Sequence, residues 1–135
     1  MEMITVEAAT DNLQQVIDFS TERLEAHDCS MKTVMQMELV IEELFVNVAS
    51  YAYDSVAGDV TVCIDFTENP SAVEMTFIDG GKPYNPLERP DPDTTLDLEE
   101  REIGGLGIFL VKKNVDEISY EYADRKNILR VKKFF

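Results

Sequence analysis

The chain has 135 residues, of which 44% are apolar, and it carries 12 Lys and Arg against 27 Asp and Glu. A chain of this length buries roughly two thirds of its unfolded surface, so a single domain over residues 1–135 needs no disulfide or metal to hold its core. The formal net charge of −15 repels phosphate backbones and anionic lipids, so we expect no direct nucleic-acid partner and no membrane partner.

The rarer residue types narrow the possible chemistry. Cys29 and Cys63 lack the spacing of a metal or redox site, and His27 is the only histidine, which argues against a zinc site and against a Ser-His-Asp hydrolase. The first residues lack a basic stretch and no apolar run approaches about 20 residues, so the sequence predicts neither a signal peptide nor a membrane span. We therefore expect a cytoplasmic protein.

The first third of the chain predicts one strand and two helices. Residues 3–7 alternate between apolar and polar types, and Asp11 with Gln14 has the spacing of a capping box before a first helix. Ser30 is a suitable N-cap for a longer helix that ends near Tyr53, because apolar residues then recur at helical spacing. This long helix should supply the main buried face of the core.

Two residue types on the long helix are interpreted as packing residues. Met31, Met35 and Met37 are interpreted as core filler, because the flexible thioether side chain fits irregular gaps. Tyr51 is interpreted as a packing tyrosine, and a place at the rim of a pocket is the alternative.

The rest of the chain combines strands, one short helix and a long irregular stretch. Two alternating runs around Glu-Asn-Pro-Ser predict a hairpin. About 25 residues rich in glycine, proline and acids then lack a regular pattern, which is typical of a functional lid or of a disordered segment. A short helix that begins with glycines and two more strands complete the pattern. The predicted ranges are 60–66 and 73–77 for the hairpin, 87–104 for the lid, 104–113 for the helix, and 116–122 and 127–134 for the last strands.

The order of these elements indicates an α+β fold. Repeated strand-helix-strand units, which produce parallel sheets, are missing from the pattern. We therefore expect a two-layer α/β sandwich in which a mainly antiparallel, mixed sheet carries the helices on one face.

The first of three patterns with chemical potential lies on the long helix. Glu43 and Asn47 are four residues apart, so their side chains share one strip of the helix. A carboxylate can take a proton from a hydroxyl, and an amide oxygen suits Mg²⁺. A solvated helix face is the alternative, because Gln36, Ser50 and Asp54 lie on the same strip.

The second pattern follows the hairpin. Asp79 ends a predicted strand and precedes Gly80, Gly81 and, after one residue, Pro83. A carboxylate beside glycines can accept a hydrogen bond from a ligand amine while the backbone closes on the ligand. The alternative is a plain turn in which Asp79 caps its own backbone.

The third pattern comes directly after the predicted lid. Gly104, Gly105 and Gly107 begin a helix, where unpaired N–H groups favour phosphate. The spacing fits neither a Walker nor a Rossmann phosphate loop. A hinge for the lid is the alternative interpretation.

In this order the three patterns resemble the ATP-binding Bergerat fold of the GHKL superfamily, named after gyrase, heat-shock chaperones, histidine kinases and MutL. The chain most resembles the stand-alone anti-sigma factor serine kinases of the RsbW and SpoIIAB type. The resemblance covers nearly the whole chain, and its most specific pieces are residues 42–47, 78–86 and 104–111.

The resemblance implies a role for each residue at a matching position. It implies that Glu43 is the general base, Asn47 the Mg²⁺ ligand and Asp79 the acceptor of the adenine amine. The further nucleotide contacts that it implies are Gly81 and Pro83 around the adenine, and Gly105, Leu106 and Gly107 at the phosphates. Tyr51 departs from the histidine that many family members have, and the spacing from Arg101 to Gly105 departs from the family pattern.

The resemblance also implies a function. The protein would be an ATP- and Mg²⁺-dependent serine kinase and anti-sigma factor that phosphorylates a small antagonist protein and otherwise binds a sigma factor, in a partner switch. Relatives of this kind form homodimers, so it implies a homodimer. A nucleotide-gated protein-binding module with little or no catalysis is the alternative, and a detached histidine-kinase catalytic domain is a third interpretation.

Overall fold

The computed structural model describes residues 1–53, 56–88 and 105–135. Within these ranges two short 3-10 turns, η1 (Thr10–Asn12) and η2 (Pro86–Glu88), accompany the helices and strands. The helices are α1 (Leu13–Ala26), α2 (Met31–Tyr51) and α3 (Gly105–Asn114). The strands are β1 (Glu2–Glu7), β2 (Asp59–Thr67), β3 (Ala72–Asp79), β4 (Glu117–Ala123) and β5 (Lys126–Phe134).

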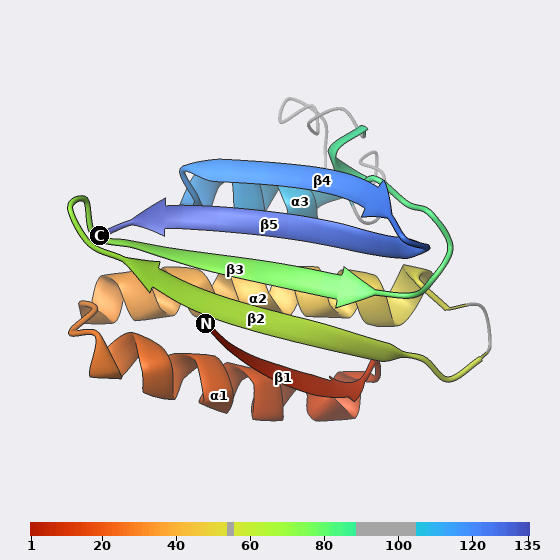
Figure 1. Ribbon diagram of the computed structural model, residues 1–135, viewed down its shortest axis with the longest axis horizontal. Coiled ribbons are helices and arrows are strands. Elements are labelled where there is room, and N and C mark those ends of the chain that lie inside the picture. Colours follow the sequence, from red (N-terminus) through yellow and green to blue (C-terminus); the bar gives the residue numbers. More distant parts are fainter. Residues whose placement is uncertain (54–55, 89–104) are drawn as a thin grey trace.

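The described strands form one five-stranded sheet in the order β1-β2-β3-β5-β4. Every neighbouring pair in it is antiparallel. The helices α1, α2 and α3 lie together on one face of the sheet, and α2 crosses behind the central strands (Figure 1). The predicted α+β sandwich with helices on one face is therefore confirmed.

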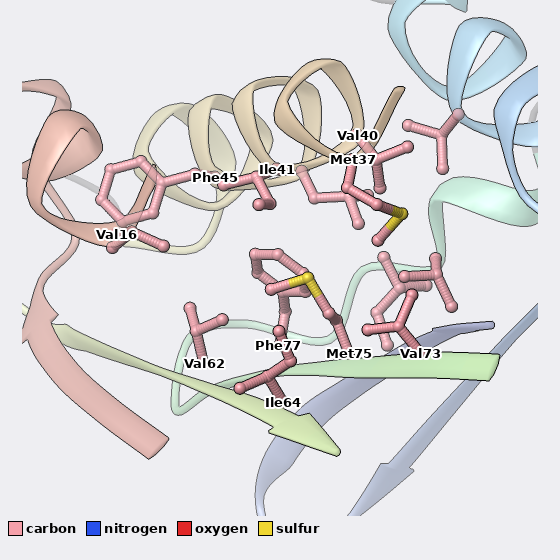
Figure 2. Packing of buried hydrophobic residues seen from close by; sticks show 14 of the residues in the cluster. Val16, Met37, Val40, Ile41, Phe45, Val62, Ile64, Val73, Met75 and Phe77 are labelled. Carbon is pink, nitrogen blue, oxygen red and sulfur yellow. The ribbon is translucent and has the colours of Figure 1, made fainter. Parts of the chain in front are cut away.

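The core lies between α2 and the central strands. The register of the sheet pairs Val62 with Phe77 and Ile64 with Met75. Because alternate residues of a strand share a face, these four side chains all point toward the helices, and Figure 2 shows them packed beneath buried side chains of α1 and α2. The buried face of α2 consists of Thr33, Val34, Met37, Val40, Ile41, Leu44 and Phe45. This packing fixes the direction in which every other side chain of α2 points.

The start of α2 follows the prediction. The Ser30 hydroxyl oxygen accepts a hydrogen bond from the backbone N–H of Thr33 at 3.2 Å, which satisfies one of the N–H groups that a helix start leaves unpaired. The helix ends at Tyr51, two residues before the predicted end. None of the helices in the described ranges combines the length and the apolar character that crossing a membrane requires.

The predicted capping box of α1 is wrong. Gln14 donates its side-chain N–H to the Asp18 carboxylate at 2.8 Å, one turn further along the helix, and makes no bond back to Asp11. The chain enters α1 through the 3-10 turn instead, and the Asn12 amide donates to the backbone oxygen of Glu7 at 2.9 Å. A side-chain bond within the helix has replaced the reciprocal cap.

The interpretation of the methionines as core filler is correct for one of the three. Met37 is fully buried, whereas Met31 is 78% exposed and Met35 is 62% exposed. Met31 and Met35 are four residues apart and share a helix face, and that face points away from the sheet. The hydrophobicity of a residue did not indicate which side of the helix it occupies.

Candidate functional site

A hollow with about 400 Å³ of empty space opens at the C-terminal end of α2, against β3, β4 and β5. Apolar and aromatic side chains form most of its wall, and Asn47, Asp79 and Asn127 add polar groups to it. Pockets of this kind, mostly apolar with a few convergent polar groups, are typical of small-molecule sites. We call it the first hollow.

Asp79 is held at the end of β3 by two hydrogen bonds. It is only 6% exposed. Its Oδ1 accepts from the Asn127 amide and from the Gly81 backbone N–H, each at 2.9 Å. In the described part of the chain no donor reaches its other oxygen, Oδ2. Asp79 therefore presents a fixed carboxylate acceptor to the first hollow.

Asn127 is a site residue that sequence reasoning missed. It lies opposite Asp79 in the register of β3 and β5. Its amide nitrogen donates to Asp79 and, at 2.8 Å, to the backbone oxygen of Lys82, while its oxygen accepts from the Tyr84 N–H at 3.1 Å and from the Tyr120 hydroxyl. Burial raises the pKa of Tyr120, which keeps that hydroxyl protonated as a donor. All four hydrogen-bonding positions of the amide are occupied, which fixes its orientation.

Gly81 lets the loop after β3 pack against the end of α2. A Cβ at this position would overlap the backbone carbonyl of Ala52. The next residue, Lys82, donates its backbone N–H to the same carbonyl at 3.0 Å. The close approach closes one side of the first hollow. Pro83 is exposed in this loop, and Pro86 is the proline that lines the hollow.

Tyr53 holds the neighbouring turn from outside the hollow. Its hydroxyl accepts a hydrogen bond from the Gly80 N–H at 2.8 Å and donates one to the backbone oxygen of Asp59 at 2.6 Å. Burial raises the pKa of Tyr53, so the hydroxyl stays protonated and both bonds persist. The phenol thus ties the end of α2 to the ends of β2 and β3, beside Asp79.

A second hollow, with about 610 Å³ of empty space, lies between α2 and α3. Glu43 and Asn47 line it from α2, and Gly107 and Ile108 line it from α3. Asn47 and Tyr51 line both hollows, so the two cavities adjoin along α2. The strip that carries Glu43 and Asn47 therefore faces a cavity, unlike a fully solvated helix face.

Aromatic rings stand where the two hollows meet. Tyr51 stacks on Tyr84, with 5.7 Å between ring centroids and 25° between planes. Both tyrosines line the first hollow. The alternative interpretation of Tyr51, a residue at the rim of a pocket, is therefore the correct one.

Glu43 lies against the first turns of α3. Burial, and to a lesser extent the neighbouring charge of Glu42, raise the pKa of Glu43. A Cβ on Gly107 would stand 2.5 Å from Glu43 Oε2, so the glycine leaves room for this carboxylate. Gly105 and Leu106 form the first turn of α3, directly before Gly107. The start of α3 and the Glu43 carboxylate thus share one cavity.

The sequence profile of the histidine kinase-like ATPase domain matches residues 6–133. The chain belongs to this family. No curated protein sequence matches it.

A solved structure shares the fold. The histidine kinase domain of the blue-light activated histidine kinase from Erythrobacter litoralis EL346 superposes with a TM-score of 0.55 at 13% sequence identity. The similarity covers 90% of this chain and 60% of that one, so this chain spans well under the full length of its structural neighbour. At this identity the likeness shows the arrangement of helices and strands and no more.

Histidine kinase-like ATPase domains bind ATP, typically with Mg²⁺. No cluster of three Asp, Glu, His or Cys side chains suited to a metal occurs among the residues that the structure describes. The Asn47 amide oxygen, half-buried and lining both hollows, is a hard ligand of the kind that Mg²⁺ accepts. Mg²⁺ usually keeps several waters and binds through few protein groups together with substrate phosphates, so the donor set fits an ion that arrives with its nucleotide.

Several predicted parts of this ATPase domain fall outside the described residues. These are the lid beyond Glu88, Arg101 and Gly104. Leu87 and Glu88, at the start of the predicted lid, form part of the turn η2. Asp79, Asn47, Glu43 and Gly107 line the two hollows, and Gly81 lies beside Asp79, to which its backbone N–H donates.

Proposed function

We propose that the chain binds ATP across the two hollows, with the adenine in the first and the triphosphate in the second. The observation that carries this proposal is the sharing of Asn47 between the cavities. In this arrangement Asp79, a buried acceptor, would lie at one end of the ATP site, and the Glu43 carboxylate, beside the start of α3, would lie at the other. This polarity matches a ligand with an amine-bearing base and an anionic tail.

The adenine end depends on Asp79. Its Oδ2 would accept a hydrogen bond from the exocyclic amine, since Oδ1 already serves Asn127 and Gly81. The stacked rings of Tyr51 and Tyr84 would contact the flat face of the base. A base that presents an oxygen at this point would meet the carboxylate and be repelled.

The phosphate end depends on α3 and Glu43. Backbone N–H groups at the start of α3 would stabilise negative charge on the phosphates. Mg²⁺, held by Asn47 and phosphate oxygens, would offset further charge. Glu43 would accept the proton of an incoming hydroxyl. At the same time the hydroxyl oxygen would bond to the γ-phosphorus, and the bond from that phosphorus to ADP would break. Transfer then yields a phosphate ester and ADP, with the proton left on Glu43.

We further propose that the hydroxyl belongs to a serine of a small antagonist protein and that the chain also binds a sigma factor. The resemblance of the three motifs to anti-sigma factor serine kinases supports this assignment. Among the described strands, β1 is paired on one side only, by β2, so its free edge could pair with a second copy in a homodimer.

Phosphoryl transfer tests the proposed function. The protein would be incubated with Mg²⁺ and ATP labelled at the γ-phosphate, together with candidate small antagonist proteins. Labelled phosphoserine on one of them is the expected result. Tight ATP binding without any labelled protein would support the nucleotide-gated binding module instead, and failure to bind ATP would contradict both.

A further inference from the structure

The outer face of α2 carries an apolar stripe that the rest of the described chain leaves largely uncovered. Met31, Met35 and Leu39 follow at intervals of four residues and so occupy one side of the helix, and we call them the methionine ridge. Met31 is 78% exposed and Met35 62% exposed, while Leu39 is half-buried. A soluble helix normally turns polar residues outward, so exposed methionines on successive turns indicate a contact surface.

The chain around the ridge is rich in acidic residues. Residues 11–46 hold eight Asp and Glu against two Lys and Arg. Of the two cations, Arg23 already pairs with Glu2, with 2.9 Å between Nε and Oε2. The acids nearest in sequence to the ridge are Asp28, Glu38, Glu42 and Glu43, and Glu22 and Glu25 follow on α1. The Thr21 hydroxyl reaches Glu38 at 3.4 Å, so α1, which carries Glu22 and Glu25, packs directly beside this part of α2.

We infer that the methionine ridge is a docking surface for a basic amphipathic helix of a partner protein. The apolar side of such a helix would pack on the flexible methionines, which adapt their shape to different side chains. Its Lys and Arg residues would meet the flanking acids, which steer the approach and fix the orientation.

Charge argues against other occupants. A second copy of this chain would place the same acids against each other, and an anionic membrane would be repelled by them. Glu43 and Asn47 continue the same spacing of four residues into the C-terminal half of α2, but the ridge lies on the N-terminal half and lines neither hollow. The inference therefore does not depend on nucleotide chemistry.

Nuclear magnetic resonance of methionine methyl groups tests the inference. The chain has six methionines, and the probe is a synthetic peptide of about 18 residues, five helical turns of Leu and Lys, at about 150 mM salt. We expect the methyl signals of Met31 and Met35 to shift on titration, while those of the fully buried Met37 and Met75 stay in place.

Two variants distinguish peptide binding at the methionine ridge from a general attraction of the peptide to the acidic protein. The double substitution Met31→Gln with Met35→Gln should weaken peptide binding about tenfold or more, because it removes the apolar contact and keeps every charge. Met3→Gln is the matched control, since Met3 is 54% exposed on β1, and it should bind as the wild type does. Both variants change exposed side chains, and circular dichroism checks that they fold.

Four outcomes would overturn the inference. A scrambled peptide of equal composition could bind equally well, or the ridge variant could keep wild-type affinity, and either result would show diffuse attraction to acids. Signals of Met31 that move with protein concentration alone would identify a second copy as the occupant. Signals that move with lipid vesicles and remain still with the peptide would identify a membrane.

Discussion

Asn127 on β5 donates a hydrogen bond to Asp79 on β3, with 2.9 Å between Nδ2 and Oδ1. Both residues are 6% exposed, and they are direct partners in the sheet register. Because three further hydrogen bonds hold the amide, it cannot turn its oxygen toward the carboxylate without leaving buried groups unpaired. The pair thus keeps a carboxylate oxygen as the acceptor that faces the first hollow.

Asp79→Asn should weaken ATP binding roughly 10- to 100-fold, because a hydrogen bond to a charged acceptor, worth about 1.5–3 kcal/mol, becomes a neutral one. Calorimetric titration with ATP measures the change. Asp65→Asn, at an exposed position of β2, is the control and should leave the affinity unchanged. Wild-type affinity in the Asp79 variant would remove Asp79 from the adenine site.

Glu43→Gln should reduce phosphoryl transfer about 10²- to 10⁴-fold while ATP affinity stays near that of the wild type, because the amide cannot accept the proton. Single-turnover transfer and nucleotide titration separate the two quantities. Glu42→Gln is a matched control, since Glu42 is the adjacent residue and is exposed. If both variants transfer phosphate at the wild-type rate, Glu43 is not the base.

The raised pKa of Glu43 predicts two opposite pH effects. The transfer rate should rise with pH through this raised pKa, because the base must be ionised to accept a proton. The folded protein binds this proton more tightly than the unfolded chain, so Glu43 contributes stability below its unfolded pKa that is lost as pH rises through its folded pKa. Glu43→Gln should therefore unfold at a higher temperature than the wild type near pH 8, and the difference should vanish near pH 4. If the difference in unfolding temperature stayed constant from about pH 4 to about pH 8, the pKa of Glu43 would not be raised in the folded protein.

The elements that the sequence predicted correctly are those that local patterns of residues indicate. The start of α2 follows from Ser30 and the apolar spacing behind it, and the hairpin β2–β3 follows from two alternating runs around a turn. Each of these signals involves residues a few positions apart, which a single sequence displays directly.

The features that sequence reasoning missed depend on distant pairing. Asn127 meets Asp79 across 48 positions of the chain, and only the strand register brings them together. An asparagine next to a turn ordinarily signals the turn itself, so nothing local marked it as part of the site. Met31 and Met35 share the composition of core residues, and only the packing of α2 shows that they face outward.

Gly81→Ala should destabilise the fold by about 1–3 kcal/mol and also weaken ATP binding, because the new Cβ would overlap the Ala52 carbonyl and push the loop after β3 away from α2. Gly80→Ala provides the matched control one residue earlier. The nearest atom to a Cβ there is the Tyr53 hydroxyl oxygen at 3.6 Å, which is an ordinary contact, so its unfolding free energy should stay within about 0.5 kcal/mol of the wild type.

Urea unfolding and ATP titration of both glycine variants measure these effects. Because the backbone carbonyl of Ala52 belongs to the end of a packed helix, it has little freedom to move aside, unlike the end of a flexible side chain. The loop must therefore shift, and it carries the N–H that binds Asp79 with it. Equal stability and equal ATP affinity of the two variants would show that the close approach at Gly81 does not shape the site.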